Sequence, residues 1–204
     1  MIQTRGEKLY DAFSYVFLIA LTLIIIYPFI HTLSVSLSTQ SEAIRPGWHL
    51  FPLEVSFDAY IQVFASEKIW IGYGNTFYRT VLGTLLSLLV TAFAAYPLAK
   101  SYFPLRKLWM VFVLITMLFD GGMIPTYLLM RELDLLNNRL VYILPGAANA
   151  FNVLVMMAFF RTIPPALEES ARIDGAGEWR VLFRIVMPLS MPVIATIGLW
   201  NAVG

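Results

Sequence analysis

Residues 12–37 read AFSYVFLIALTLIIIYPFIHTLSVSL, a stretch that holds no Asp, Glu, Lys or Arg. A run of about 20 apolar residues is long enough to cross a bilayer as a helix. Arg5 and Lys8 precede it, as cations precede the apolar part of a signal peptide. The block is too long for a cleavable peptide, however, and no clear small-residue cleavage site closes it. We therefore interpret residues 12–37 as an uncleaved first membrane span, in which Pro28 is expected to cause a kink.

The composition of the whole chain is also that of a membrane protein. Of the 204 residues, 59% are hydrophobic and 13% are charged, against about 45–50% and about 25% in soluble domains. Mean hydropathy is +0.73. The net charge of +1 gives no general attraction for nucleic acid. Because the sequence has no Cys and only two His, His31 and His49, we expect no disulfide, no metal and no other cofactor.

Four further apolar blocks follow, and they predict an all-α, polytopic bundle of transmembrane helices. The predicted spans cover residues 12–37, 77–99, 108–130, 140–160 and 188–204, and the third is expected to be interrupted at Asp120-Gly121-Gly122 and Pro125. Arg79 lies inside the second block. Ten Leu, Val and Phe residues at about −0.3 to −0.6 kcal/mol each outweigh one Arg at about +2.5 to +3.5 kcal/mol, so the span is retained. The last block is at the lower limit for crossing a bilayer, so we expect that span to be incomplete and the chain to be truncated.

The connecting segments predict which side of the membrane each end faces. With the N-terminus inside, the inner segments carry nine cations and the outer ones four. The inner cations are Arg5, Lys8, Lys100, Arg106, Lys107, Arg161, Arg172, Arg180 and Arg184, and the outer ones are Arg45, Lys68, Arg131 and Arg139. Because Lys and Arg accumulate on the cytoplasmic side, residues 1–11 are predicted to be a cytoplasmic N-terminus. Residues 12–204 are then a transmembrane domain with a cytoplasmic loop at 161–187.

The predicted outer loop contains one amphipathic segment. Phe57, Tyr60, Ile61 and Phe64 recur at helical spacing, and Ser56 is available as an N-cap. A short helix is expected here. It either lies on the membrane surface or on other helices, or it docks an external partner.

The inner loop carries the most informative sequence, RTIPPALEESARIDGAGEWRVLFRIVMPLSMP, at residues 161–192. Pro164 and Pro165 suit the first turn of a helix, and Gly175 suits the residue that follows a helix end. A second helix is expected from Gly177, with Trp179, Leu182, Phe183 and Val186 on one apolar face. From composition alone, this loop is equally consistent with a basic amphipathic helix that binds anionic lipid headgroups.

The order of residues in the loop resembles the EAA loop of permease subunits in bacterial ABC importers. That motif reads roughly EAAxxDGA, a spacer and IxLP, and residues 169–176 (ESARIDGA) and 185–188 (IVMP) match it. Ser170 replaces the first Ala of the motif, and Met187 replaces its Leu. Residues 121–127 (GGMIPTY) and 144–147 (LPGA) resemble maltose-type carbohydrate permeases, within the binding-protein-dependent transport inner-membrane components. Members of that family have six spans, which agrees with the expected truncation.

The resemblance implies a permease subunit of an ATP-driven importer of sugars or oligosaccharides, in the plasma membrane of a bacterium. Such a subunit forms half of the translocation path, and its coupling loop sits in a groove of a cytoplasmic ATPase. The residues assigned to coupling are Glu168, Glu169, Ala171, Asp174, Gly175, Ala176, Trp179, Leu182, Phe183 and Pro188. The three carboxylates are expected to meet a basic groove rim. The two alanines are expected to let the two proteins approach closely, and the apolar side chains to anchor the second helix to the membrane core.

The resemblance also implies the partners. They are a second, related permease chain, two ABC ATPase subunits, an extracellular solute-binding lipoprotein and membrane lipid. The sequence has no GxxxxGK[ST] phosphate-binding loop. We therefore expect no enzymatic activity from this chain and ATP binding by the ATPase partners. The alternative within the same class is an ABC permease for a non-sugar solute such as a peptide or an amino acid.

Four residues are candidates for the substrate path. Asn149 and Asn152 are amides at membrane depth, which either line a polar cavity or satisfy neighbouring helices. Asp120 stands before Gly121 and Gly122, and it either caps a helix break or contacts substrate. Tyr127, like Tyr96 and Tyr142, either stacks on a sugar ring or belongs to an interfacial aromatic belt.

Two other classes of membrane protein fit the sequence poorly. An intramembrane protease needs paired catalytic groups at depth, but Asp120 has no second carboxylate within a predicted span, and no HExxH occurs. A transporter driven by an ion gradient usually shows internal repeats and intramembrane charges, and we find neither pattern.

Overall fold

The computed structural model describes residues 5–204, which form two compact units divided between Ile71 and Gly72. Within residues 5–204 the regular structure is helical, with one isolated β-bridge between Ser38 and Val55. Residues 1–4 of the predicted cytoplasmic N-terminus lie outside the described residues. From Arg5 the chain is already part of the first long helix.

The first unit contains a long helix and a short outer segment. Helix α1 (Arg5–Ser36) continues through Pro28, and α2 (Gln40–Ala43) and α3 (Asp58–Ala65) follow. The helix expected around residues 57–64 is therefore confirmed. It begins at Asp58, whose N–H donates to Ser56 Oγ at 3.1 Å. The Ser36 and Tyr60 hydroxyls are 2.8 Å apart and join α3 to the end of α1.

Glu42 organises the loop between α2 and α3. Its carboxylate accepts the N–H of Glu54 at 3.0 Å and the N–H of Leu53 at 2.6 Å. These two hydrogen bonds, that from Glu54 foremost, hold the pKa of Glu42 below its usual range. The loop thus has its own polar centre, in which one carboxylate satisfies two backbone donors.

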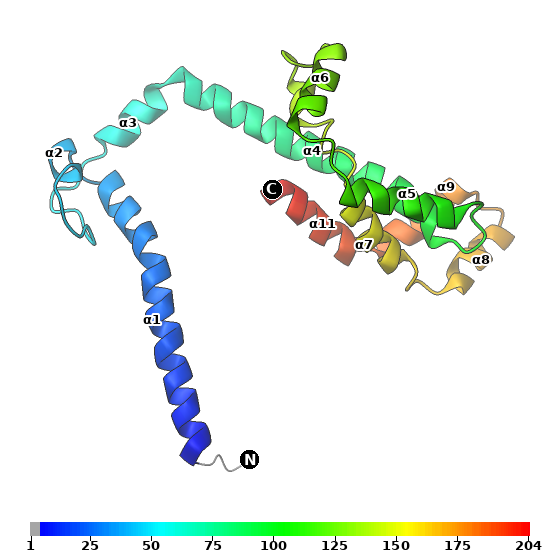
Figure 1. The fold of residues 1–204 in the computed structure, drawn as a ribbon, viewed down its shortest axis with the longest axis horizontal. Coiled ribbons are helices and arrows are strands. Elements are labelled where there is room, and N and C mark those ends of the chain that lie inside the picture. Colours follow the sequence, from blue (N-terminus) through cyan, green and yellow to red (C-terminus); the bar gives the residue numbers. More distant parts are fainter. Residues whose placement is uncertain (1–4) are drawn as a thin grey trace. The chain divides into compact units, whose positions relative to one another are not determined.

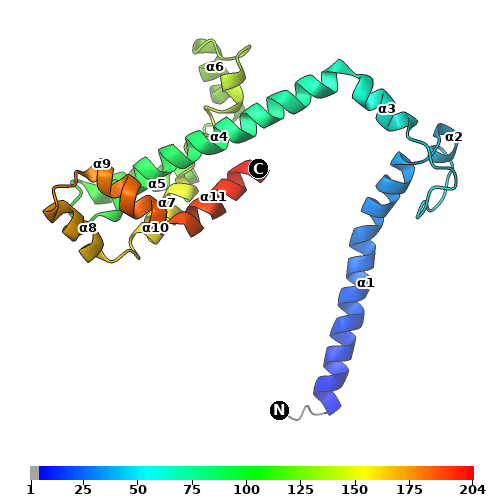
Figure 2. The same ribbon diagram turned by 180° about the vertical axis from the view of Figure 1, so that it is seen from behind.

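The second unit is a helical bundle, shown from opposite sides in Figures 1 and 2. Its helices are α4 (Glu67–Ala99, which starts in the first unit), α5 (Arg106–Leu118), α6 (Met123–Glu132), the 3₁₀ helix η1 (Arg139–Tyr142), α7 (Ala150–Phe160), α8 (Pro165–Ile173), α9 (Glu178–Val181), the π-helix η2 (Leu182–Val186), α10 (Met187–Leu189) and α11 (Met191–Val203). Helix α7 packs against both α5 and α11. The buried core lies between the second half of α4, α7, η2 and α11. Ala92 and Ala95 of α4 are fully buried there, because small side chains let membrane helices approach closely.

The prediction of an all-α, multi-span membrane protein is confirmed. Helices α1 and α4 are each long and apolar enough to cross a bilayer. Three pairs of shorter helices bring the number to five if each pair forms one span: α5 with α6, α7 with α8, and residues Glu178–Leu189 with α11. The members of these pairs meet at bends of 109°, 77° and 81°, respectively.

One predicted interruption is confirmed, and one predicted span has wrong bounds. The span expected at 108–130 is broken between Leu118 and Met123, where Gly122 has a φ of +82°, at the Gly-Gly segment that was expected to break it. The span expected at 140–160 is α-helical only over Ala150–Phe160, because Pro145 and Gly146 lie in an irregular segment after η1. Hydropathy records apolar composition, and at residues 140–160 it did not reveal that Pro145 and Gly146 interrupt the helix.

The helices at the predicted spans 77–99 and 188–204 also begin at other residues than expected. Helix α4 begins at Glu67, ten residues before the apolar block at 77–99. The last helix was expected to start at Pro188, but Pro188 lies inside α10. The chain bends at Ser190, and α11 begins at Met191. The bend precedes Pro192, which has no N–H to continue the preceding helix.

Candidate functional site

The loop at 161–187 folds into two short helices, α8 and α9, joined by a tight turn, as predicted. Gly175 has a φ of +80°, a conformation that glycine adopts without the steric cost that other residues incur. Its N–H donates to Arg172 O at 3.0 Å, and the N–H of Ala176 donates to Ala171 O at 2.9 Å. This pair of bonds is the Schellman motif that closes a helix end. We call residues 165–181 the elbow.

The two alanines of the turn face inward. Ala171 and Ala176 are half-buried and pack against the hydrophobic core of this unit. They are the residues at which a Schellman motif places its apolar contact. We expected them to face a partner protein, but here their small size lets the turn sit close to its own bundle.

Glu168 also points inward. Its residue is 5% exposed, and its carboxylate forms an ion pair with Lys100, just beyond the end of α4. Arg172, one helical turn later, lies 3.6 Å from the other carboxylate oxygen. Lys100 Nζ also lies 4.6 Å from the centre of the Tyr96 ring, within the range of a cation–π contact. The expectation that Glu168 offers its charge to an external groove is therefore wrong in this structure, because that charge is neutralised within the chain.

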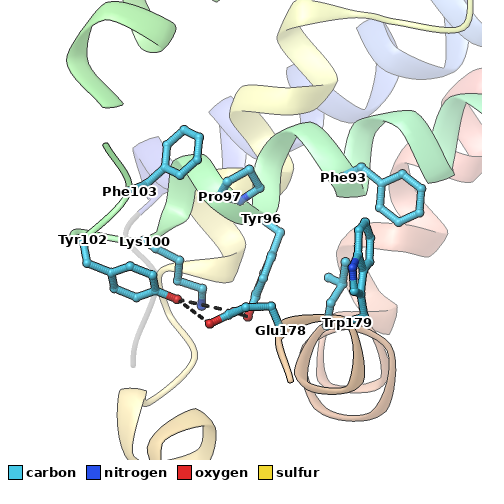
Figure 3. Close-up of a pocket in the computed structure, with 9 residues that line it drawn as sticks. Phe93, Tyr96, Pro97, Lys100, Tyr102, Phe103, Glu178 and Trp179 are labelled. Carbon is cyan, nitrogen blue, oxygen red and sulfur yellow. Dashed lines mark hydrogen bonds between the residues drawn. The ribbon is translucent and has the colours of Figure 1, made fainter. Parts of the chain in front are cut away.

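Glu178 is the second residue that attaches the elbow to the end of α4, as Figure 3 shows. Tyr96 donates to its carboxylate at 2.7 Å, and Tyr102 donates to it at 3.3 Å. Arg172 donates to both oxygens, from Nε at 3.1 Å and from Nη2 at 3.2 Å. Arg172 Nη2 also bonds to the Tyr102 hydroxyl. We call Tyr96, Lys100, Tyr102, Glu168, Arg172 and Glu178 the elbow network.

The network shifts the titration of its exposed members. Partial burial acts to raise the pKa of Glu178, but the hydrogen bonds from Tyr96 and Arg172 together outweigh it and hold that pKa below its usual range. Burial and the negative charge of Glu178 raise the pKa of Tyr102. Glu178 is therefore ionised, and Tyr102 protonated, at neutral pH. This is the charge state that the hydrogen bonds require.

Arg161 joins the end of α7 to the end of α4. Its Nη2 lies 3.3 Å from Leu98 O and 3.1 Å from Met157 Sδ. Leu98 O belongs to the last turn of α4, where carbonyl groups have no helical partner. The same end of α4 thus meets both the start and the finish of the 161–178 segment.

The apolar residues of the second helix divide into two groups. Leu182 is buried together with Val181 and Val186, whereas Trp179 and Phe183 remain exposed and pack edge-on against Phe93 of α4, at 5.4 and 5.9 Å between ring centres. One α-helical face was expected for Trp179, Leu182, Phe183 and Val186. Residues Leu182–Val186 are instead π-helical, which widens the turn and changes the residues that face inward.

Three side chains of the elbow point outward at its tip. Glu169 and Asp174 are exposed, as expected for carboxylates that meet a partner. Ile173, which lies between them in the chain, is 86% exposed, and sequence reasoning missed it. The sequence feature that could have revealed it is a single aliphatic residue directly before Asp174-Gly175, at a helix end where it has no apolar neighbours to bury it.

The two candidate amides of the substrate path have structural partners. Asn149 caps α7, since its Oδ1 accepts the N–H of Asn152 at 3.1 Å. Asn152 is 5% exposed, and its Nδ2 donates to Asn201 Oδ1 at 3.3 Å. Asn201 Nδ2 in turn donates to Ser87 Oγ at 3.2 Å. Of the two interpretations of these amides, the structure favours the one in which they satisfy neighbouring helices.

Asp120 and Tyr127 lie together on an open hollow of about 490 Å³ beside α6. Asp120 Oδ1 accepts the N–H of Gly122 at 3.1 Å, so Asp120 caps the break between α5 and α6. Tyr127 is about half exposed. Asn149 and Asn152 do not line this hollow, so it does not bring the four path candidates together. Tyr96 belongs to the elbow network and lies beside Glu178, which removes it from the sugar-stacking candidates.

These features define a class of protein: a multi-span, all-helical membrane protein in which one connection between spans is a helical elbow held against the bundle. Residues 69–204 match the family described as binding-protein-dependent transport system inner membrane component. The chain belongs to this family, whose members are permease subunits of ABC importers in the inner membrane and are not themselves enzymes. The interpretations as an intramembrane protease or an ion-driven transporter are therefore excluded.

Individual relatives agree with this assignment. The polygalacturonan/rhamnogalacturonan transport system permease protein YtcP of Bacillus subtilis is 41% identical over 197 residues, which are 97% of this chain and 69% of that protein. The maltodextrin transport system permease protein MalD of Streptococcus pneumoniae is 28% identical over 208 residues, 97% of this chain and 71% of that protein. The crystal structure of a bacterial ABC transporter involved in the import of the acidic polysaccharide alginate matches with a TM-score of 0.95 and 34% identity. The match covers 100% of this chain and 72% of that one.

Proposed function

We propose that this chain is the permease subunit of an ATP-driven importer of saccharides, and that the elbow transmits the motion of the ATPase to the membrane helices. The observation that carries the second part is the elbow network, which fixes both elbow helices to the end of α4. The relatives named for polygalacturonan, maltodextrin and alginate support a saccharide over a peptide or an amino acid.

The other parts of such an importer lie on separate chains. A second permease chain completes the translocation path, and an extracellular solute-binding lipoprotein delivers the saccharide. Two ABC ATPase subunits bind and hydrolyse ATP on the cytoplasmic side. The distribution of Lys and Arg predicts that the elbow lies on the same side. In this scheme the chain contributes half of the path and a mechanical connection to the ATPase.

The contacts of the elbow suit a mechanical role. A force on the exposed tip at Ile173 and Asp174 reaches Arg172 within the same turn. Arg172 contacts Glu168 and Glu178, and these two carboxylates contact Lys100 and Tyr96 at the end of α4. Rotating the elbow against α4 would separate buried charges, which is costly. The elbow and the end of α4 therefore move together.

The absence of Cys from the sequence allows a direct test. Ile173→Cys in the full-length chain places one thiol at the exposed tip, to be paired with a Cys in the permease-facing groove of the cognate ATPase. We expect a disulfide crosslink whose yield changes when ATP is added. The control is Met123→Cys, which is 84% exposed at the start of α6 and should give no crosslink.

The two parts of the proposal fail separately. An assembled complex without any crosslink from Ile173→Cys would favour the lipid-binding interpretation of the loop. Uptake is measured in cells with labelled oligosaccharides and a labelled dipeptide. Accumulation of the dipeptide alone would contradict the saccharide assignment.

A further inference from the structure

A second cavity of the Gly72–Gly204 unit lies far from the elbow. It has a volume of about 280 Å³ and is lined by α4, by the segment after η1 and by the end of α11. This volume is near the lower end of the usual range for ligand pockets, about 300–1,000 Å³. It suits one unit of a larger ligand.

Arg79 supplies the charge of this cavity. It lies on α4, 21 residues before Lys100, which corresponds to about 31 Å along a helix. With Lys100 on the inner side, Arg79 stands at the outer end of the span. Its side chain is exposed, and no ion pair within residues 5–204 involves it. An ionisable side chain within a membrane span is a functional candidate by default.

The neutral groups beside Arg79 are hydrogen-bonding and aromatic. Asn201 and Ser87 line the cavity and are bonded to each other at 3.2 Å. Thr84 Oγ1 is buried and has no hydrogen-bond partner among residues 5–204, although buried hydroxyls are nearly always bonded. Tyr142 and Trp200 form the aromatic part of the lining, and both are about half exposed.

Together these groups match the chemistry of an acidic sugar. A guanidinium pairs with a carboxylate through two parallel hydrogen bonds. A hydroxyl and an amide can bond to ring hydroxyls, and aromatic rings can stack on the apolar face of a sugar. A neutral sugar would use the hydrogen-bonding groups and the aromatic rings but would leave the Arg79 cation unpaired.

We propose that this cavity contacts one uronic-acid unit of the transported saccharide, with Arg79 pairing to its carboxylate. This inference rests on the proposed function, and it narrows the substrate class to acidic saccharides. Arg79 is then a specificity-determining residue at the outer part of the path. The competing occupant is a lipid phosphate, to which an Arg near the membrane surface can also extend.

The test compares uptake of an oligogalacturonate with uptake of its methyl ester, which is neutral but otherwise the same chain. The full-length importer carries wild-type, Arg79→Gln, Arg79→Lys or Arg139→Gln permease. We expect Arg79→Gln to raise the half-saturating concentration of the acidic form about tenfold or more and to leave that of the ester unchanged. Arg79→Lys should retain a preference for the acidic form, because it keeps the charge but loses the paired geometry. Arg139→Gln is the matched control, because Arg139 stacks on Tyr78 at 5.9 Å and lies outside the cavity. This variant should change the uptake of neither saccharide.

The remaining outcomes separate the two proposals. If Arg79→Gln reduced uptake of the oligogalacturonate and of its methyl ester equally, the inference would be overturned. That result would favour a structural or lipid-binding role for Arg79 and would leave the importer assignment intact. An unchanged acidic preference in Arg79→Gln would overturn it as well. A wild-type importer that takes up neither form, although assembled and active in ATP hydrolysis, would contradict the saccharide assignment and the inference together. If Arg79→Gln does not assemble, the proposal is tested with Arg79→Lys. Loss of the preference for the acidic saccharide in Arg79→Lys would contradict the proposal.

Discussion

The ammonium of Lys100 and the carboxylate of Glu168 form an ion pair at the point where the end of α4 meets α8, and their side chains are only 11% and 7% exposed. The partners are 68 residues apart in the chain. The pair therefore fixes the elbow to a transmembrane helix that is remote in sequence. Because both groups are nearly buried, each depends on the other for its charge to be tolerated.

Removing one partner of this pair should destabilise the fold. Lys100→Met leaves the Glu168 carboxylate with Arg172 alone, at 3.6 Å. We expect the free energy of unfolding to fall, but by less than the about 3–5 kcal/mol that a wholly uncompensated buried charge costs, because Arg172 remains beside the carboxylate. Thermal unfolding of the purified permease in detergent measures this loss.

The double variant Lys100→Met/Glu168→Leu is the control for that experiment. It removes both charges, and apolar pairs that replace buried ion pairs are often neutral in stability. We expect it to be more stable than Lys100→Met alone. A double variant as unstable as the sum of the two single variants would show that the two residues act independently.

Gly175 and Gly177 offer a matched pair for the turn of the elbow. A Cβ added at either residue meets no atom within 4 Å, but only Gly175 has a positive φ, of +80°. Gly175→Ala should therefore cost about 1–2 kcal/mol of stability, and Gly177→Ala should cost almost nothing. Equal melting temperatures for the two variants would contradict the role assigned to the turn.

The local signals of the elbow were readable in the sequence, and its long-range contacts were not. Pro164-Pro165 and Gly175 correctly predicted where α8 begins and ends, since these residues act within one or two turns. The pairing of Glu168 with Lys100 was missed because nothing in the order of residues relates positions so far apart. Glu168 was consequently interpreted as a surface charge.

Helix geometry limited the sequence analysis in a second way. A period of 3.6 residues grouped Trp179 with Leu182 and Phe183, but the π-helical turn at Leu182–Val186 changes that period. The predicted span at 140–160 failed for a related reason, because residues 143–149 are apolar but irregular. Hydropathy predicted the class of fold, and backbone irregularities determined where the elements begin.

Stability near acid pH should depend on Glu178. Its pKa is held below the usual range in the folded protein. The stabilisation from its bonds to Tyr96 and Arg172 is therefore fully present above the unfolded-state pKa, near 4.3. It is lost as the pH falls through the lower, folded-state pKa. Between pH 7 and pH 5 we expect a constant difference in melting temperature between wild type and Glu178→Gln, and a smaller difference below pH 4.

Glu169→Gln is the control for the pH experiment, because Glu169 is an exposed carboxylate of the same elbow that lies outside the network. It should change the stability by less than about 0.5 kcal/mol. If Glu178→Gln and Glu169→Gln had the same effect at pH 7, the hydrogen bonds to Glu178 would not stabilise the elbow.

The amide chain from Asn152 through Asn201 to Ser87 should couple α7, α11 and α4. Asn201 takes part in both bonds, at 3.3 and 3.2 Å, so Asn201→Ala should destabilise the bundle more than Ser87→Ala. Hydrogen bonds between membrane helices are worth about 0.6 kcal/mol on average and about 1.7 kcal/mol at most. A double-mutant cycle of Asn152→Ala and Asn201→Ala, measured by reversible unfolding in detergent or bicelles, should give a coupling energy in that range. A coupling of zero would mean that the two amides are satisfied separately, and that the packing of α7 on α11 rests on apolar contacts such as the Phe151–Trp200 ring pair.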